Sequence, residues 1–167
     1  MSKIYGVVTG LVVNVDDPLK TGRVQLRFPW LGEQVESQWA RVATMMAGKD
    51  RGSWFMPEVD DEVLVAFEHG NVEHPFVLGF LWNGKDKPPR DDTKIRVLKS
   101  LNGHEIEITD PPVTGGDKGH IRIKDAHGNV IELSNGRISI TAVAFIDIKA
   151  PQVVINGRPV VPAPSPI

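Results

Sequence analysis

The stretch that decides the fold runs from residue 119 to residue 157 and reads GHIRIKDAHGNVIELSNGRISITAVAFIDIKAPQVVING. It contains five pairs of apolar residues, and a single residue separates the two members of each pair. Gly, Asn, Asp or Pro stands in most of the gaps between pairs. Alternation with a period of two, bounded by turn residues, predicts a series of short β-strands. The paired residues are Ile121, Ile123, Ile131, Leu133, Ile138, Ile140, Ile146, Ile148, Val153 and Ile155.

These strands lack an obvious partner for their apolar face. The stretch has one aromatic residue, Phe145, and no segment with the pattern of a covering helix. A lone ribbon would leave its Ile side chains half exposed and two strand edges unpaired. Three copies around one axis would bury the side chains and close the edges, so the ten paired residues are predicted to form a trimer core. The alternative is a flat antiparallel meander that covers the N-terminal half of the chain.

The N-terminal half has a different composition from the rest. A polar stretch, NGKDKPPRDD (residues 83–92), follows all four Trp residues, the one Tyr and five of the six Phe residues. Five strand-like segments without a convincing helix lie before it, which predicts a small closed barrel of the oligonucleotide/oligosaccharide-binding (OB) type. Because aromatic residues bury large areas, this half is expected to build its own core from them.

The sequence therefore predicts an all-β protein with four segments. Residues 1–90 form the OB-fold domain, and residues 91–118 form a linker and the start of a needle. Residues 119–158 form an intertwined, triple-stranded β-helix of a homotrimer, and residues 159–167 form a Pro-rich tail.

Composition narrows the range of functions. The 167 residues carry a net charge of −2 and no cysteine, so neither nucleic-acid binding nor thiol chemistry is favoured. The N-terminus lacks the basic start and apolar core of a signal peptide, and the protein is expected to be made in the cytoplasm.

Neither a catalytic site nor a metal or cofactor site is predicted. His69 and His74 flank a Gly70-Asn71 loop and could meet across a hairpin, but no third ligand has a fixed spacing. The acidic run PEVDDEV (residues 57–63) has the character of a solvated turn. The chain is accordingly expected not to be an enzyme.

Several motifs resemble a known family. WARV, DRGSWFMPEVDDEVLVAFEHG, HPFVLGFLWNG and the following KPP are similar to the OB domain of phage baseplate spike proteins and of valine-glycine repeat proteins of type VI secretion. KSLNGHEIEITD and IRIKDAHGNVIELS are similar to the start and body of their trimeric β-helical needle. The resemblance implies a structural homotrimeric spike on the hub of a contractile tail or injection particle, in transient contact with the target membrane. It also implies a stand-alone spike whose hub is encoded separately.

The C-terminal segment NGRPVVPAPSPI (residues 156–167) contains four prolines, which cannot continue a β-ladder, so the ribbon is expected to end near Ile155. The resemblance implies a small tip protein of the PAAR type seated on this end. The alternative is that the tail folds back to plug the end itself or is disordered. The expected docking residues are Pro159, Val160, Val161, Pro162, Pro164, Pro166 and Ile167.

An alternative function is an OB-fold nucleic-acid or glycan binder with a trimerising stalk. Exposed aromatic residues beside a basic groove would favour it. The N-terminal half instead mixes acidic and basic residues, and most of its aromatic residues fall at apolar strand positions. The structural spike is therefore the preferred interpretation.

Overall fold

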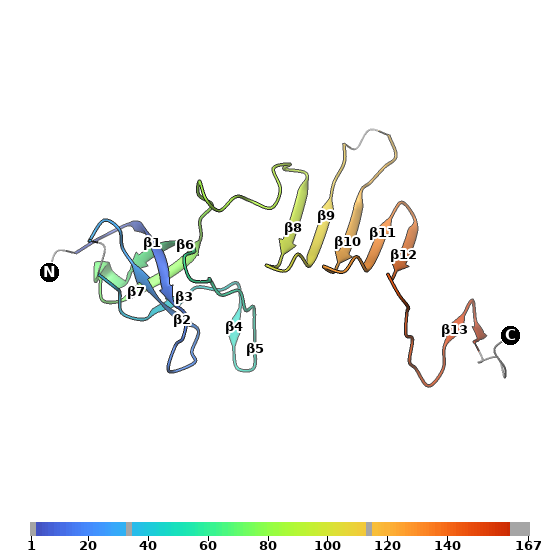
Figure 1. The fold of residues 1–167 in the computed structure, drawn as a ribbon, viewed down its shortest axis with the longest axis horizontal. Coiled ribbons are helices and arrows are strands. Elements are labelled where there is room, and N and C mark those ends of the chain that lie inside the picture. The colour runs from blue at the N-terminus through green and yellow to red at the C-terminus, as the bar shows by residue number, and fades with distance from the viewer. Residues whose placement is uncertain (1–2, 33–34, 113–114, 161–167) are drawn as a thin grey trace. The chain divides into compact units, whose positions relative to one another are not determined.

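The computed structural model describes residues 3–32, 35–112 and 115–160 (Figure 1). The chain divides into two compact units, Met1–Pro88 and Pro89–Ile167. In the described residues the regular secondary structure consists of β-strands, apart from a single 3-10 turn, η1 (Glu68–Gly70). Within these ranges, no helix has the length and apolar character that crossing a bilayer requires. The prediction of an all-β protein is confirmed.

The first unit is a closed five-stranded barrel with the strand order β1-β2-β3-β7-β6. All neighbouring pairs are antiparallel except β3 and β7, which are parallel. The hairpin expected around Gly70-Asn71 connects β6 to β7. These five strands are the five predicted from the sequence, and their bounds are Val7–Asn14 (β1), Arg23–Arg27 (β2), Ala40–Val42 (β3), Glu62–Phe67 (β6) and Pro75–Phe80 (β7).

Alternating side chains fill the inside of the barrel. In β2 and β6 every second residue is buried, as expected for strands with one face toward a core. The interior of a five-stranded barrel is narrow, which favours compact aliphatic side chains. The buried core consists of Val12, Val24, Leu26, Phe28, Ala40, Val63, Val65, Phe67 and Val77.

The barrel unit builds its own core, as expected, but most of its aromatic residues are not part of it. Only Phe28 and Phe67 are buried, and their rings meet edge to face at 5.6 Å. Trp54 is 74% exposed, and Tyr5 and Trp82 are also largely exposed. Val and Leu already fill the barrel, so the large rings are left on its surface.

Two short features of the barrel unit were not expected from the sequence. The strands β4 (Ala47–Gly48) and β5 (Arg51–Gly52) form a small hairpin between β3 and β6. In the β1–β2 connection, Asp17 accepts hydrogen bonds from the amides of Leu19 and Thr21 and from the Arg23 side chain. The Arg23 hydrogen bond is the main reason that the pKa of Asp17 lies well below its usual value.

The second unit contains a five-stranded antiparallel sheet with the order β12-β11-β10-β9-β8, so each strand lies beside its neighbour in sequence (Figure 1). The β11–β12 hairpin turns at Asn135 and Gly136, both with the positive φ that a type I′ turn requires. The strand bounds are Ile95–Lys99 (β8), Glu105–Thr109 (β9), His120–Lys124 (β10), Val130–Ser134 (β11) and Arg137–Thr141 (β12).

Just before β10, the backbone of Gly119 passes very close to Thr109 and Pro111. Gly119 has a φ of 81°, and a Cβ atom at this position would overlap the carbonyl oxygen of Thr109 and the ring of Pro111. Glycine is therefore required here for both conformation and space.

A separate two-stranded hairpin follows, formed by β13 (Val154–Ile155) and β14 (Arg158–Pro159). The amide of Val160 donates to the carbonyl of Val153 at 2.7 Å, so the expectation that the ribbon ends near Ile155 is wrong. Pro159 is tolerated because it lies one pair beyond the hydrogen-bonded pair next to the turn, where an antiparallel strand does not need the amide.

Candidate assembly surface

The register of the second sheet places its apolar side chains on one face. Ile121 pairs with Ile108 on one side and Leu133 on the other, and Ile123 pairs with Ile106 and Ile131. Because paired residues share a face, the apolar residues form two rows that cross all or most of the strands. One row contains Ile108, Ile121, Leu133 and Ile138, and the other contains Leu98, Ile106, Ile123, Ile131 and Ile140.

Within one chain this face, which we call the apolar face, is uncovered. The nine side chains that form it are between 41% and 72% exposed. Contiguous apolar surface of this kind is unusual on a monomer and marks an interaction site. At the β8 edge the first row continues into Arg96, which makes an ion pair with Asp110, so the apolar face has a charged border there.

The opposite face of the same sheet is polar, and several of its charged side chains form ion pairs. Arg122 donates to Glu132 through Nε at 2.9 Å and Nη2 at 2.6 Å. The Arg122 hydrogen bond is the main reason that the pKa of Glu132 is below its usual value. His120, which alternates with Ile121 and Ile123 along β10, lies on this face beside Glu107. The two faces therefore differ in character: one is apolar and exposed, and the other carries most of the sheet's ion pairs.

The structure brings six of the ten predicted core residues together on the apolar face. Ile146 and Ile148 lie outside any strand. Ile155 belongs to the β13–β14 hairpin, and Val153 is the residue just before it. Sequence reasoning missed Leu98, Ile106 and Ile108, although EIEI (residues 105–108) has the same alternating signal. The six residues are Ile121, Ile123, Ile131, Leu133, Ile138 and Ile140.

The segment between β12 and β13 has strand-like sequence without a strand partner. Residues 144–152 make no backbone–backbone hydrogen bond to any other residue in the ranges that the structure describes. Just before them, the amide of Val143 donates to the side chain of Asn129. Ile146 and Ile148 are exposed. The segment therefore combines exposed apolar side chains with backbone groups that have no partner among the described residues.

The described part of the C-terminal tail is short. Pro159 belongs to β14, and Val160 follows it with its side chain exposed. The other five predicted docking residues, Val161, Pro162, Pro164, Pro166 and Ile167, lie outside the described residues.

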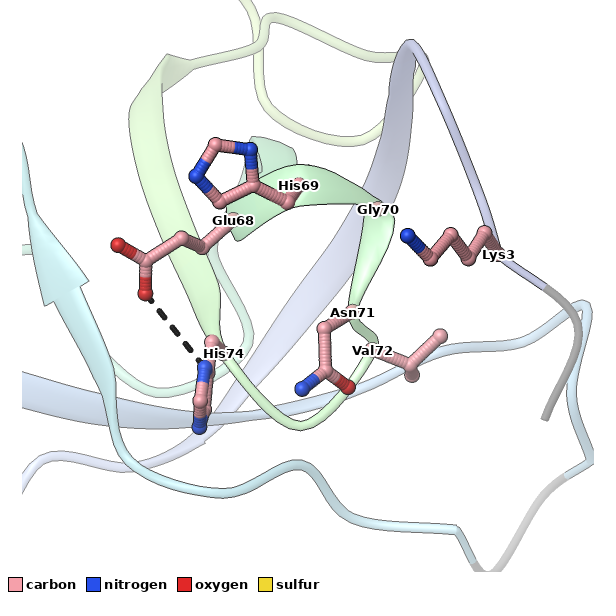
Figure 2. Close-up of a pocket in the computed structure, with 7 residues that line it drawn as sticks. All are labelled: Lys3, Glu68, His69, Gly70, Asn71, Val72 and His74. Atoms are coloured by element: carbon pink, nitrogen blue, oxygen red, sulfur yellow. Dashed lines mark ion pairs between the residues drawn. The ribbon is translucent and has the colours of Figure 1, made fainter.

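The barrel unit has a pocket of about 360 Å³ where the β6–β7 connection passes the N-terminal segment (Figure 2). His74 Nδ1 lies 3.5 Å from Glu68 Oε2, and Figure 2 shows His69 apart from this pair, with Lys3 across the pocket. In the described ranges, three or more metal-ligating side chains do not cluster anywhere. The pocket therefore does not contain such a cluster among its described residues.

Comparison with protein families agrees with this division of the chain. Residues 8–82 match the "Type VI secretion system/phage-baseplate injector OB domain". Residues 95–161, which include the whole apolar face, match the "Phage baseplate V C-terminal trimerisation domain". The first match confirms the OB barrel.

Individual relatives are spike proteins of type VI secretion. Spike protein VgrG5 of Pseudomonas aeruginosa is 32% identical over 126 residues, or 73% of this chain and 15% of the relative. VgrG1a of the same species is 33% identical over 126 residues, or 66% and 19% of the two chains. Actin cross-linking toxin VgrG1 of Vibrio cholerae is 33% identical over 72 residues, or 41% and 7%.

This chain thus spans less than a fifth of the length of each of these relatives. The two matched domains nevertheless take in most of the chain. The first match lies in the barrel unit, and the second lies in the unit that contains the five-stranded sheet. The chain belongs to the baseplate spike family that phages share with type VI secretion systems.

Proposed function

We propose that the protein is a structural, non-enzymatic spike that assembles as a homotrimer at the centre of the baseplate of a contractile injection device. The observation that carries this proposal is the apolar face, which is uncovered within one chain and lies inside the range that matches a trimerisation domain. Family membership supports the baseplate role. Trimerisation and piercing of the target envelope are inferences from the geometry and from the relatives.

Self-association is the simplest way to cover the apolar face. Burying the exposed half of an Ile or Leu side chain contributes about 1 kcal/mol, and each chain offers nine such side chains. Three sheets related by a threefold axis can point these faces toward one another and leave the paired charges in solvent. A closed ring has no uncovered copy at its ends, so it stops at a defined size.

The expected intertwining of chains is narrower than residues 119–158. Both edges of β10 and of β11 are paired with strands of the same chain, which supports a shorter intertwined region. Among the described residues, the segment 144–152 has no such strand partner. We therefore place the intertwined, β-helical part of the needle after Thr141, where three copies of the segment would supply one another's hydrogen bonds.

The two ends of the spike have different proposed partners. The OB barrel is proposed to bind the baseplate hub, and the family match to an injector domain supports this assignment. The β13–β14 hairpin exposes Val154, Ile155 and Val160, which suits it to carry a separate tip protein of the PAAR type. Synthesis in the cytoplasm, followed by assembly into the particle, fits this role.

Imaging of assembled particles tests the proposed function. Particles from cells that lack this chain are expected to have no central density beneath the tube or to fail to assemble. A variant without residues 159–167 should restore the central density but lose the distal cap, if a tip protein binds there. Normal particles in the absence of the chain would contradict the spike role, and an unchanged cap on the truncated variant would remove the tip partner.

A further inference from the structure

A cluster of charged side chains on the polar face of the second sheet has no role in the apolar contact just proposed. Arg90 donates to Glu107 Oε2 through both Nε, at 3.1 Å, and Nη2, at 2.8 Å. Nη2 also donates to Glu105 Oε2 at 3.0 Å. The remaining carboxylate oxygens are occupied as well, because Lys99 lies 3.0 Å from Glu105 and His120 lies 3.3 Å from Glu107.

The cluster is shielded from solvent more than a surface ion pair usually is. Glu107 is only 7% exposed, although it lies on the polar face. Burial opposes its ionisation, but hydrogen bonds from Arg90 and His120 outweigh that effect and hold the pKa of Glu107 below its usual value. Charged hydrogen bonds in such surroundings are the stronger ones, and the planar guanidinium suits two carboxylates at once.

Arg90 is also at a special place in the chain, since it precedes β8 and follows the junction between the two units. On the barrel side of the junction, Asn83 closes a turn by accepting the amides of Lys85 and Asp86 through its Oδ1. Between that turn and Arg90 stand Lys87 and two prolines, and prolines restrict φ. The connection is thus short, stiffened by proline, and ends at a side chain fixed to β9.

We propose that Arg90 is a clasp that anchors the end of the connection between the two units to the polar face of the second sheet. The clasp lies within one chain, so it forms whether or not the chain assembles. The mechanical consequence rests on the proposed spike function. A force on the barrel would be transmitted through Arg90 to β9, because the end of the connection is fixed there and is not free to move. Three copies of the clasp would surround the axis on the outside of the needle.

Trypsin provides a direct test, because it must bind the side chain of Arg90 in its own acidic pocket before it can cut the Arg90–Asp91 bond. In the folded full-length chain this bond is expected to resist cleavage. The double variant Glu105→Gln, Glu107→Gln frees Arg90 without changing the cut site and should be cleaved at least about tenfold faster. Mass spectrometry of the fragments 1–90 and 91–167 identifies the cut.

A matched control and a second variant make the result specific. Glu132→Gln removes a carboxylate from the same face, which pairs with Arg122 and Arg137 but not with Arg90, and should leave the rate unchanged. Arg90→Lys keeps a trypsin site but loses the forked contact, so it should also be cut faster. Rapid cleavage of the parent chain at Arg90, or equal acceleration by Glu132→Gln, would overturn the proposal. So would failure of Arg90→Lys to accelerate cleavage.

Discussion

Replacing Ile140 with Asp is expected to abolish assembly while leaving the sheet of each chain folded. Ile140 pairs with Ile131 on the apolar face and is 58% exposed within one chain, so a carboxylate there is well solvated before assembly. In a trimer the same carboxylate would be buried in three copies around one axis. Desolvation costs several kcal/mol for each charge, and repulsion adds to it, so about 10 kcal/mol per trimer is lost.

The neighbouring residue provides the control for this variant. Ser139 lies on the polar face opposite Glu132, and Ser139→Asp adds the same charge to the same strand. Ser139 is half-buried and faces Glu132, so the new carboxylate should cost up to about 1 kcal/mol within the chain, but the variant should retain assembly. Sedimentation velocity measures both variants at the same concentration. Equal behaviour of the two variants would show that the apolar face is not the assembly surface.

Separating the chain between Pro88 and Pro89 is expected to give two fragments with different behaviour. Fragment 1–88 contains the whole barrel core, so it should fold with a cooperative thermal transition and remain a monomer. Fragment 89–167 contains the apolar face and the unpaired segment, so it should assemble by itself. Circular dichroism follows the transition, and native mass spectrometry gives the number of copies.

Two outcomes would contradict assembly through the apolar face. A tightly trimeric barrel fragment would place the assembly surface on the first unit. A C-terminal fragment that stays folded and monomeric at micromolar concentration would mean that the apolar face tolerates solvent and needs no partner.

Much of the fold could be predicted because strands leave a local signal. The alternation in RVQLR (residues 23–27) and in IRIK (residues 121–124) identifies both a strand and the face that it buries. The same reasoning predicts that Ile121 and Ile123 share a face, which the register bears out. The two-residue turns were also readable, since Asn-Gly at residues 135–136 favours the required positive φ.

The remaining features depend on information that is not local. Trp54 and Tyr5 are large aromatic residues of the kind usually found in a core, but both are exposed. Other side chains already fill the barrel interior, and this is evident only from the closed barrel itself. The clasp depends on which residues of β8, β9 and β10 become neighbours. Ile146 and Ile148 follow the strand pattern, yet a strand forms only beside a partner, and the described part of the chain places none beside them.

The mass of the intact chain in solution tests the central claim most directly. One chain has a mass of 18.4 kDa, and a trimer held together by the apolar face has three times that mass, about 55 kDa. Multi-angle light scattering after size exclusion at micromolar concentration should give this value in a single peak. A single peak at 18.4 kDa from folded protein would contradict the account.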